Sequence, residues 1–406
     1  MGRFRVYMKT FLPSGQYMAD YSEITKDVIK LGNISQSLDN GDYDLGISKN
    51  ASVKITMRND TGKYSVPENV TSLFPYKRSG SQIKITWSYR DWELQPGFFN
   101  AGNEPLCLEV DMFEGLLDDI AGQSTIVDQD IDFTILGFES LFDKAVVPFS
   151  AITNGDMLSD VIFEVLNQSS ITNLLTVSAL NISLGQDVAI DDKTDLENKT
   201  VKEALKNLLL VSNSILYIKN RTVYVTSRDA TPELKYRFYG QSSIKGLENI
   251  IDIKNFRDGF NRTLNYWTWQ DSSYLARDLS SIDKYGVLKR QINSKIITNA
   301  TAINSLLQAN RDEFSNPKTE FNVDTPINYQ TKDLFFKDRV SFDYPNVYVP
   351  FEGSILPRYG QETYNSLAKY PYGQMSLTLS DVDNFKILSR IIDTTKQTIT
   401  FGVRKI

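Results

Sequence analysis

Apolar and polar residues alternate through several separate segments near the start of the chain, and this period of two constrains the fold most. Val53, Ile55 and Met57 alternate with polar residues, and the same alternation recurs over 82–90 and 106–113. Side chains of a β-strand point to opposite faces in turn, so each segment predicts a strand with one buried face. Several such strands at this spacing predict a barrel or a sandwich.

The chain contains no histidine and a single cysteine, Cys107. Imidazole is the base of Ser-His-Asp and Cys-His catalytic systems and the commonest ligand of metal sites. A lone thiol can form neither an intramolecular disulfide nor a Cys-rich metal cage. We therefore expect a protein that acts through its shape and surfaces: not an enzyme, with no catalytic residue, no cofactor and no metal.

The charge and the apolar runs exclude two further classes of protein. The formal net charge is −6, whereas a general nucleic-acid binder needs clustered Lys and Arg to neutralise phosphate. An acidic surface would still suit a protein along which DNA slides without binding. No apolar run approaches the roughly 20 residues that span a bilayer, so we expect no membrane-spanning segment.

Helical spacing begins after Asp156 and defines a middle block. Thr200 and Glu203 form a predicted capping box ahead of an apolar stripe. A hairpin is then predicted over 215–226, with Asn220 and Arg221 at its turn. These signals predict a small α+β unit.

Strand patterns return after this unit, interrupted by a helix predicted over 300–314. The expected domains are a first β-barrel domain with long loops at 1–149, an α+β domain at 150–235, and a second β-barrel domain at 236–406. The expected fold class is mainly β with an α+β insert.

One acidic segment has the spacing of a calcium loop. Asp128, Asp130, Asp132 and Glu139 occupy the first, third, fifth and twelfth places. Phe133 stands where the sharp turn of such a loop needs glycine. We therefore favour a solvated acidic turn that leads into a strand.

Two other groups of carboxylates have simpler explanations than chemistry. Asp191, Asp192, Asp195 and Glu197 precede the capped helix, where negative charge is favourable, and a metal site is the alternative. A glycosidase pair could be hidden among five carboxylates, but the chain is rich in such groups and surface charge is favoured. Those five are Glu104, Glu109, Glu114, Asp118 and Asp119.

The tryptophans Trp87, Trp92, Trp267 and Trp269 lie in aromatic stretches. Trp267 and Trp269 fall on the same face of a predicted strand, which is the geometry of a sugar-stacking platform. Packing in a core or an interface is the favoured interpretation, because aromatic residues dominate both.

Three stretches carry a likeness to a known family: the helix-and-hairpin block 201–225, the phrase DLFFKDRVSFDYP at 333–345, and the ending at 385–404. Together they resemble the central tail-hub proteins of tailed bacteriophages, also called baseplate hub or tail-associated proteins. The opening, 52–64, looks like the first barrel of such a hub, so the likeness covers nearly the whole chain.

The resemblance implies two tube-like β-barrel domains flanking a small α/β domain, with three copies forming a ring. Such a ring connects the hexameric tail tube or distal tail ring to the tail tip and lines a channel for DNA. The implied partners are a second and third copy, a distal tail or tail tube protein, the tape measure protein, and tail tip, spike or fibre proteins. DNA is implied only in transit during ejection.

The implied location is the tail tip or baseplate of the virion, after assembly in the host cytoplasm, with a role in host cell attachment. Because the chain ends at Ile406, directly after the last expected strand, we expect no cell-wall-degrading extension. Two alternatives stay open: a hexameric distal tail ring, and a carbohydrate-binding receptor protein of the tail tip that uses Trp267 and Trp269.

Overall fold

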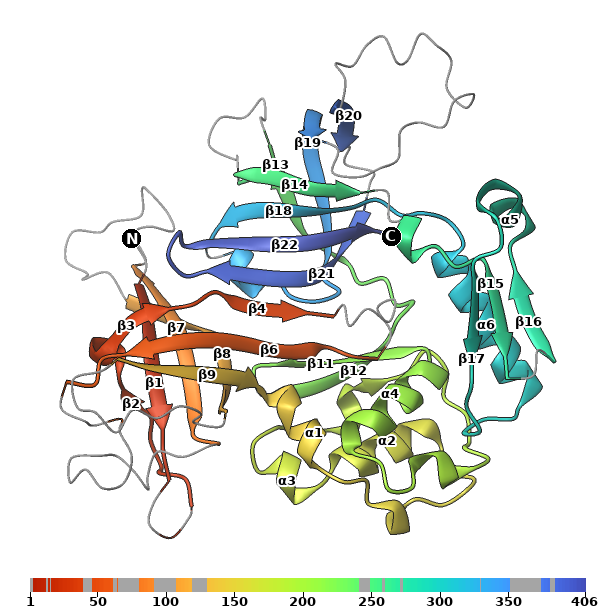
Figure 1. The fold of residues 1–406 in the computed structure, drawn as a ribbon, viewed down its shortest axis with the longest axis horizontal. Coiled ribbons are helices and arrows are strands. Elements are labelled where there is room, and N and C mark those ends of the chain that lie inside the picture. The colour runs from red at the N-terminus through yellow and green to blue at the C-terminus, as the bar shows by residue number, and fades with distance from the viewer. Residues whose placement is uncertain are drawn as a thin grey trace.

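The structure is a computed structural model in which antiparallel β-sheet dominates (Figure 1). It describes residues 3–11, 14, 16–38, 46–60, 64, 80–90, 107–118, 130–240, 249–257, 260–270, 273–328, 330–350, 374–379 and 384–406. No helix within these ranges has the length and apolar character needed to cross a membrane.

The first β-rich segment folds as its alternating sequence predicts. Val53, Ile55 and Met57 in β6 are buried, while their neighbours are exposed or half-buried. β6 pairs with β9, and β8, β7 and β1 follow in order. The strands of this segment are β1 (Arg3–Lys9), β2 (Ser22–Glu23), β3 (Val28–Leu31), β4 (Ile34–Ser37), β5 (Gly46–Ile47), β6 (Lys49–Met57), β7 (Gln82–Arg90), β8 (Cys107–Leu117) and β9 (Ile131–Gly137); the short helix η1 (Thr25–Asp27) lies among them.

The second β-rich segment continues the same sheet. Its strands are β13 (Leu234–Tyr239), β14 (Asp252–Arg257), β18 (Glu320–Pro326), β19 (Arg339–Pro350), β20 (Gln374–Leu379), β21 (Asn384–Asp393) and β22 (Thr398–Lys405). β21 pairs antiparallel with β4 of the first segment, which places Ile392 opposite Ile34. The Leu38 amide also donates to the Leu388 carbonyl at 2.8 Å.

Apart from β5, the described strands of the two β-rich segments form one 15-stranded sheet, and its main path runs from β14 to β2 without closing. The expectation of two separate barrels is therefore wrong for these strands. The physical reason is the pairing of β4, which bonds β6 on one edge and β21 on the other. A single hydrophobic cluster includes residues from both segments, such as Ile55 and Phe342.

The middle block is an α+β unit, as predicted. In its capping box, the Thr200 hydroxyl accepts from the Glu203 amide at 3.3 Å, and the Glu203 carboxylate accepts from the Thr200 amide at 3.0 Å. Its small sheet has the order β10–β12–β11–β5, so β5 of the first segment extends it. Its elements are η3 (Phe138–Ser140), α1 (Leu141–Lys144), η4 (Phe149–Ala151), α2 (Leu158–Leu166), α3 (Ser169–Thr172), η5 (Ala179–Asn181), β10 (Ile182–Ser183), η6 (Lys193–Leu196), α4 (Val201–Val211), β11 (Ser214–Lys219) and β12 (Thr222–Ser227).

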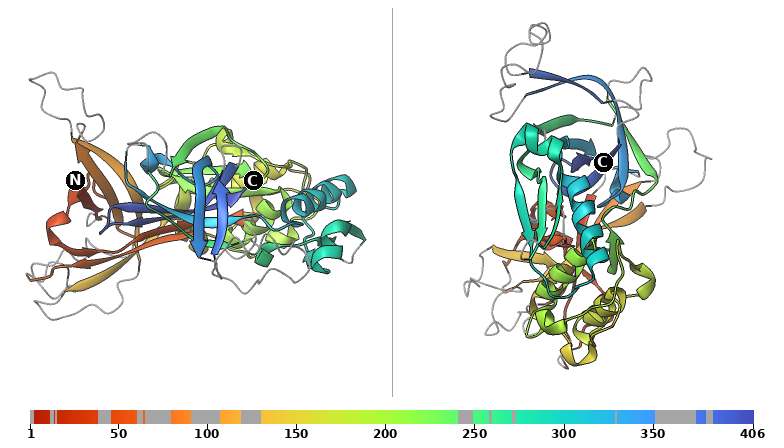
Figure 2. Two further views of the ribbon diagram at one scale, coloured as in Figure 1. Left: turned by 90° about the horizontal axis from the view of Figure 1, so that it is seen from above. Right: turned by 90° about the vertical axis from the view of Figure 1, so that its right-hand side faces the viewer.

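A further unit of helices and a three-stranded sheet lies at the opposite end of the molecule from β1 (Figure 2). The helix predicted over 300–314 is observed here. Its apolar residues share one cluster with those of α2 and α4. The elements are η7 (Phe260–Arg262), β15 (Tyr266–Trp269), β16 (Tyr274–Arg277), α5 (Leu279–Tyr285), β17 (Lys289–Ile292) and α6 (Ala300–Phe314); η8 (Thr331–Asp333) follows β18.

Candidate functional site

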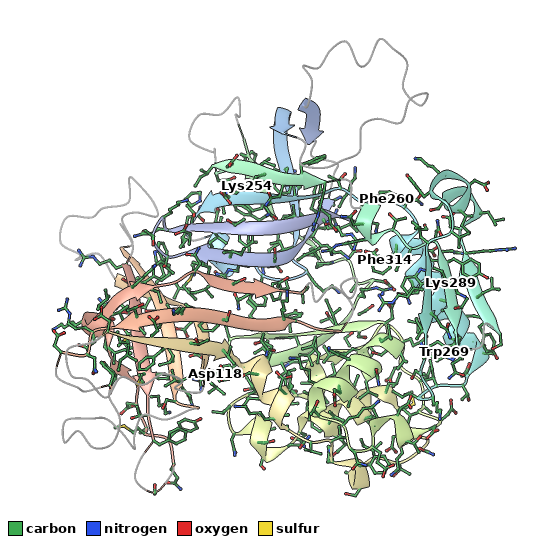
Figure 3. All side chains as sticks on the ribbon, in the orientation of Figure 1. Asp118, Lys254, Phe260, Trp269, Lys289 and Phe314 are labelled. Carbon is green, nitrogen blue, oxygen red and sulfur yellow. The ribbon has the colours of Figure 1, made fainter. Side chains whose placement is uncertain are left out.

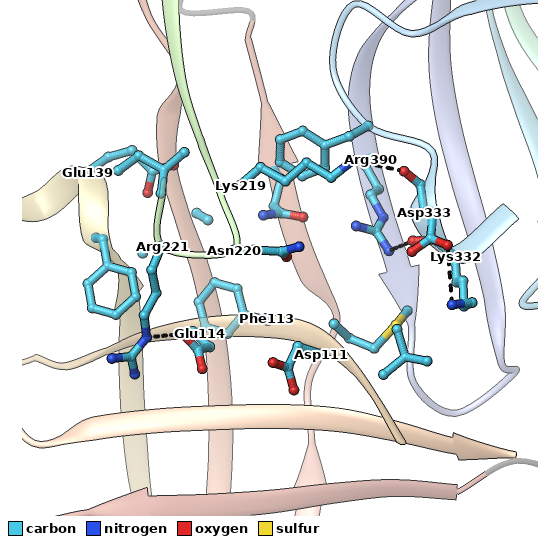
Figure 4. A pocket seen from close by; sticks show the side chains of 18 of the residues that line it. Asp111, Phe113, Glu114, Glu139, Lys219, Asn220, Arg221, Lys332, Asp333 and Arg390 are labelled. Atoms are coloured by element: carbon cyan, nitrogen blue, oxygen red, sulfur yellow. Dashed lines mark hydrogen bonds and ion pairs between the residues drawn. The ribbon is translucent and has the colours of Figure 1, made fainter. Parts of the chain in front are cut away.

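The first β-rich segment, the hairpin β11–β12 and the second β-rich segment meet around a cavity of about 460 Å³ (Figure 4). β8 supplies one wall and the hairpin tip a second. η8 and β21 supply a third. The site is therefore built at the junction of three parts of the fold.

The hairpin tip is a tight turn of two residues with left-handed backbone. Asn220 has a φ of 49° and Arg221 a φ of 59°, as a type I′ turn requires. Asn tolerates this conformation, whereas an arginine there costs roughly 1 kcal/mol. The turn nevertheless directs the Arg221 side chain across the cavity toward the first sheet.

Arg221 binds three side chains of the first segment. Its guanidinium forms an ion pair with Glu114 of β8 and donates to the Tyr21 hydroxyl. It also donates to the Gln82 amide oxygen at 2.9 Å. Burial lowers the pKa of Arg221, but its hydrogen bond to Glu114 and the charge of that carboxylate outweigh burial, so the pKa is raised. The ion pair with Glu114 and the hydrogen bonds to Tyr21 and Gln82 hold the hairpin against the first sheet.

A β-bulge places Glu114 where Arg221 can reach it. Asp111 lies opposite Thr86 and Glu114 opposite Lys84, so the extra residue, Met112, brings both carboxylates to one face of β8. Without the bulge the strict alternation of a strand would have put Glu114 and Asp111 on opposite faces.

β11, the strand that leads into the turn, contacts the wall formed by η8 and β21. Lys219 donates from Nζ to the Asp333 carbonyl at 3.1 Å and lies over the Phe335 ring. Arg390 of β21 donates to the Lys332 carbonyl at 2.9 Å. The hairpin tip is thus attached to both β-rich segments.

The acidic segment with calcium-loop spacing does not form a cation site in the described residues. Asp132 pairs with Lys54 at 2.6 Å and accepts from Thr56 at 2.7 Å, whereas Glu139 is buried beside Ser48. Burial raises the pKa of Glu139 to about 7. Asp128 lies outside the described residues. No group of three or more Cys, Asp or Glu residues suited to a metal occurs in the described ranges.

The acidic residues before α4 bind backbone amides. Asp192 accepts from the Thr194 amide at 2.9 Å and so caps η6. Asp195 accepts from the Lys295 amide at 2.8 Å, and Asp191 accepts from the Thr298 amide at 2.6 Å. These carboxylates tie the α+β unit to the loop before α6, a role that the sequence pattern did not reveal.

The tryptophans pack in the core. Trp267 and Trp269 share a face of β15, as predicted, but both are buried where α6 packs against β15, and the Trp267 ring lies 5.9 Å from the Phe314 ring. Figure 3 labels Trp269 and Phe314 in this unit. Trp87 is buried under the first sheet, and Trp92 lies outside the described residues. Burial excludes Trp267 and Trp269 as a surface platform for sugars.

Two of the carboxylates considered as a glycosidase pair, Glu109 and Glu114, form ion pairs. Glu109 pairs with Arg5 at 2.8 Å and accepts from the Tyr7 hydroxyl at 2.9 Å. Glu114 pairs with Arg221, and the Asp118 amide donates to the Thr134 carbonyl at 2.9 Å. Glu104 and Asp119 lie outside the described residues.

No protein-family model matches the sequence, and no curated protein matches it significantly. Solved structures do match. The tail protein from Neisseria meningitidis MC58 has a TM-score of 0.55 at 10% identity, over 99% of this chain and 96% of its own. The 43 kDa tail protein of prophage MuSo2 from Shewanella oneidensis has a TM-score of 0.50 at 12% identity, over 98% and 96%.

A third match is to the Francisella PdpA-VgrG complex, with a TM-score of 0.50 at 8% identity, over all of this chain and 58% of that chain. At these identities the likeness establishes a shared fold. The resemblance inferred from the sequence is confirmed at that level, because two of these matches are tail proteins, one of them of a prophage, and both align over almost their entire length.

Proposed function

We propose that this chain, which has the fold of phage tail proteins, is a structural protein of a phage or phage-like tail. The observation that carries the proposal is the match along 99% of this chain and 96% of the Neisseria tail protein, since an inserted or appended domain shared by chance would align only in part. Within the tail, we assign it to the central hub at the tip or baseplate of the virion.

The assembly we propose is a homotrimeric ring around a channel. The described sheet ends at β14 and β2, so these strands present backbone groups that copies of the chain can pair or cover. Ile251, just before β14, is 58% exposed, which favours a covered edge in the assembly. The ring would connect the hexameric tube or distal tail ring to the tip, and DNA would pass through it.

The partners we propose are therefore the distal tail or tail tube protein, the tape measure protein and the tip, spike or fibre proteins. Assembly in the host cytoplasm and a part in host cell attachment belong to the same proposal. We also propose that the chain is not an enzyme, which agrees with the ion pairs that hold Glu109 and Glu114.

Native mass spectrometry of the purified chain, followed by negative-stain imaging, tests the proposal. A trimer with a central hole is expected. A hexamer would favour the distal tail ring instead. A monomer at high concentration, with no ring in the images, would overturn both assignments.

A further inference from the structure

We propose that the three-stranded sheet β16–β15–β17 docks, through its face away from α6, against α2 of a neighbouring copy of this chain. The inference rests on the proposed homotrimer and assigns two of its contact surfaces. A closed ring of three identical chains uses heterologous contacts, in which one patch of each copy meets a different patch of the next. Each copy must therefore carry two different surfaces that fit each other.

The outer face of the sheet, opposite α6, presents two cations on either side of a tyrosine. Trp267 of β15 points toward α6, which packs on β15 and β16. Tyr266 precedes it and so lies on the outer face, with Arg277 of β16 and Lys289 of β17 directly opposite on the two neighbouring strands. The Lys289 Nζ lies 5.7 Å from the centre of the Tyr266 ring, so these two side chains share a face. Figure 3 labels Lys289 on this sheet.

The rest of the outer face is suited to contact with a protein. Leu275 of β16 lies opposite Thr268 of β15 and is 46% exposed. The Thr268 Oγ1 is buried without a hydrogen-bond partner. Arg277 and Lys289 are exposed, and neither forms an ion pair within the described residues. Tyr and Arg are enriched in protein interfaces, and an exposed leucine beside them adds apolar area.

The complementary surface is the exposed side of α2, which is acidic. Asp160 and Glu164 are one turn apart on this helix, and both are exposed. Asp187 accepts from the Ser159 amide at 3.0 Å and from the Ser159 hydroxyl at 2.7 Å, so a third carboxylate lies at the first turn. Like charges four residues apart destabilise a helix. Positive charge supplied by another molecule would relieve this repulsion.

The two surfaces match in spacing. The cations of the sheet lie on the strands that flank β15, so their Cα atoms are about 10 Å apart. Asp160 and Glu164 are about 6 Å apart along the axis of α2. Because Arg and Lys have long side chains, both cations of the sheet can reach both carboxylates of the helix.

The two surfaces also match in apolar content. The helix η5, which packs against α2, presents Leu180, and 95% of this residue is exposed. Leu275 is the exposed leucine of the sheet surface. Each surface therefore places one leucine next to its charges, and contact between the copies would remove apolar area of both from water.

A second copy is the occupant that the charges favour. Segment 150–199 has eight Asp and Glu residues and two Lys, whereas segment 260–314 has seven Lys and Arg residues and five Asp and Glu. The acidic unit of one copy should therefore attract the basic unit of the next. Within one copy the two surfaces do not cover each other, because their charged residues are all exposed.

Analytical ultracentrifugation of the full chain, in a dilution series at constant ionic strength, tests the contact with two charge-reversed variants. Asp160→Lys with Glu164→Lys reverses the helix surface, and Arg277→Glu with Lys289→Glu reverses the sheet surface. In each variant like charges would meet, so half-dissociation of the trimer should require a concentration about ten-fold or more above the wild-type value. A variant with all four substitutions restores opposite charges and should assemble as the wild type does.

The matched control is Lys144→Glu with Lys206→Glu, on exposed residues of the α+β unit. It changes the net charge as much as the sheet variant does and should leave the trimer unchanged. Circular dichroism checks that every variant is folded. Folded reversed variants that assemble like the wild type would overturn this contact and leave the trimer intact. Failure of the four substitutions to restore assembly would also overturn it, whereas a monomeric wild type would overturn the trimer and the contact together.

Carbodiimide coupling, which joins an amine directly to a carboxylate, locates the contact in the wild type. Trimers are assembled from a mixture of copies with light and heavy nitrogen. Lys289 should be coupled to Asp160 or Glu164, and the joined peptides should include pairs with one light and one heavy label. Coupling only between peptides of the same label would place the contact within one copy and overturn the proposal.

Discussion

Arg221, at the tip of the β11–β12 hairpin, forms an ion pair with Glu114 in the middle of β8, although the two residues are 107 positions apart in the sequence. Arg221 is 30% and Glu114 15% exposed at the side chain, so the pair is shielded from water more than a surface pair is. It is therefore a specific contact between the α+β unit and the first sheet.

Arg221→Met is expected to lower the free energy of unfolding by about 1–3 kcal/mol, because it leaves Glu114 without its counter-charge. Urea unfolding of Arg221→Met, Glu114→Gln and the double variant measures the coupling between the two side chains. The exposed pair Lys54 and Asp132 is the control, and its coupling should be about 0–1 kcal/mol. A coupling for Arg221 and Glu114 no larger than that of the control would show that this ion pair does not stabilise the contact between the hairpin and the first sheet.

The pairing of β4 with β21 makes one unit of the two β-rich segments. Ile34 and Ile392 lie opposite each other and are both fully buried. Ile34→Ala should cost about 2–5 kcal/mol of stability. Ile29→Ala, on β3 with 48% of the residue exposed, is the control and should change stability by about 0.5 kcal/mol or less.

Urea unfolding followed by both fluorescence and circular dichroism checks this expectation. If the two probes stay coincident and shift together in Ile34→Ala, the segments unfold as one body. Two separate transitions, with only one moved by the substitution, would show that β4 does not join the segments.

Glu139 predicts a loss of stability as the pH rises. Burial raises its pKa from 4.5 to about 7, so the folded chain holds this proton more tightly than the unfolded chain does. That contribution is complete below the unfolded pKa and is lost as the pH rises through the folded pKa. Between pH 5 and 8, the wild type should lose about 2 kcal/mol relative to Glu139→Gln, which keeps an acceptor for Ser48.

Unfolding free energies of both proteins at several pH values test this difference, with Glu164→Gln on the exposed side of α2 as the control for removal of one carboxylate. A constant difference between the wild type and Glu139→Gln across this range would show that Glu139 is not protonated in the folded protein.

Local features of the fold could be predicted from the sequence, because their causes lie within a few neighbouring residues. The alternation around Val53 identifies β6, the Thr200–Glu203 capping box identifies α4, and the turn at Asn220 identifies the hairpin. The α6 helix, Ala300–Phe314, was predicted from its apolar stripe for the same reason.

The junction could not be predicted, because it depends on contacts between distant residues. β4 has the short sequence ISQS, which carries no sign that its partner begins more than 300 residues later at β21. The bulge at Met112 reverses which side chains share a face, so alternation alone misplaces Glu114. In the sequence, Arg390 is a single charged residue within an apolar strand. Only the fold brings Gln36 and Lys332 next to it.

Lys337 predicts the opposite pH dependence to Glu139. Its Nζ donates to the Ser227 carbonyl. Burial, together with the charges of Lys386 and Arg228, lowers its pKa from 10.5 to about 8, so the unfolded chain binds this proton more tightly. The cost of charging the buried amine is complete below pH 8 and disappears as the pH rises toward 10.5.

Between pH 7 and 10, the wild type should therefore gain about 2 kcal/mol relative to Lys337→Met, which fills the same space without a charge. Denaturant unfolding of both proteins at matched ionic strength measures the gain, and effects of other titrating groups cancel in the difference. Lys235→Met, on an exposed residue of β13, is the control for loss of a lysine. A difference between the wild type and Lys337→Met that stays flat, or that falls with pH, would place the Lys337 amine in water instead of in the core.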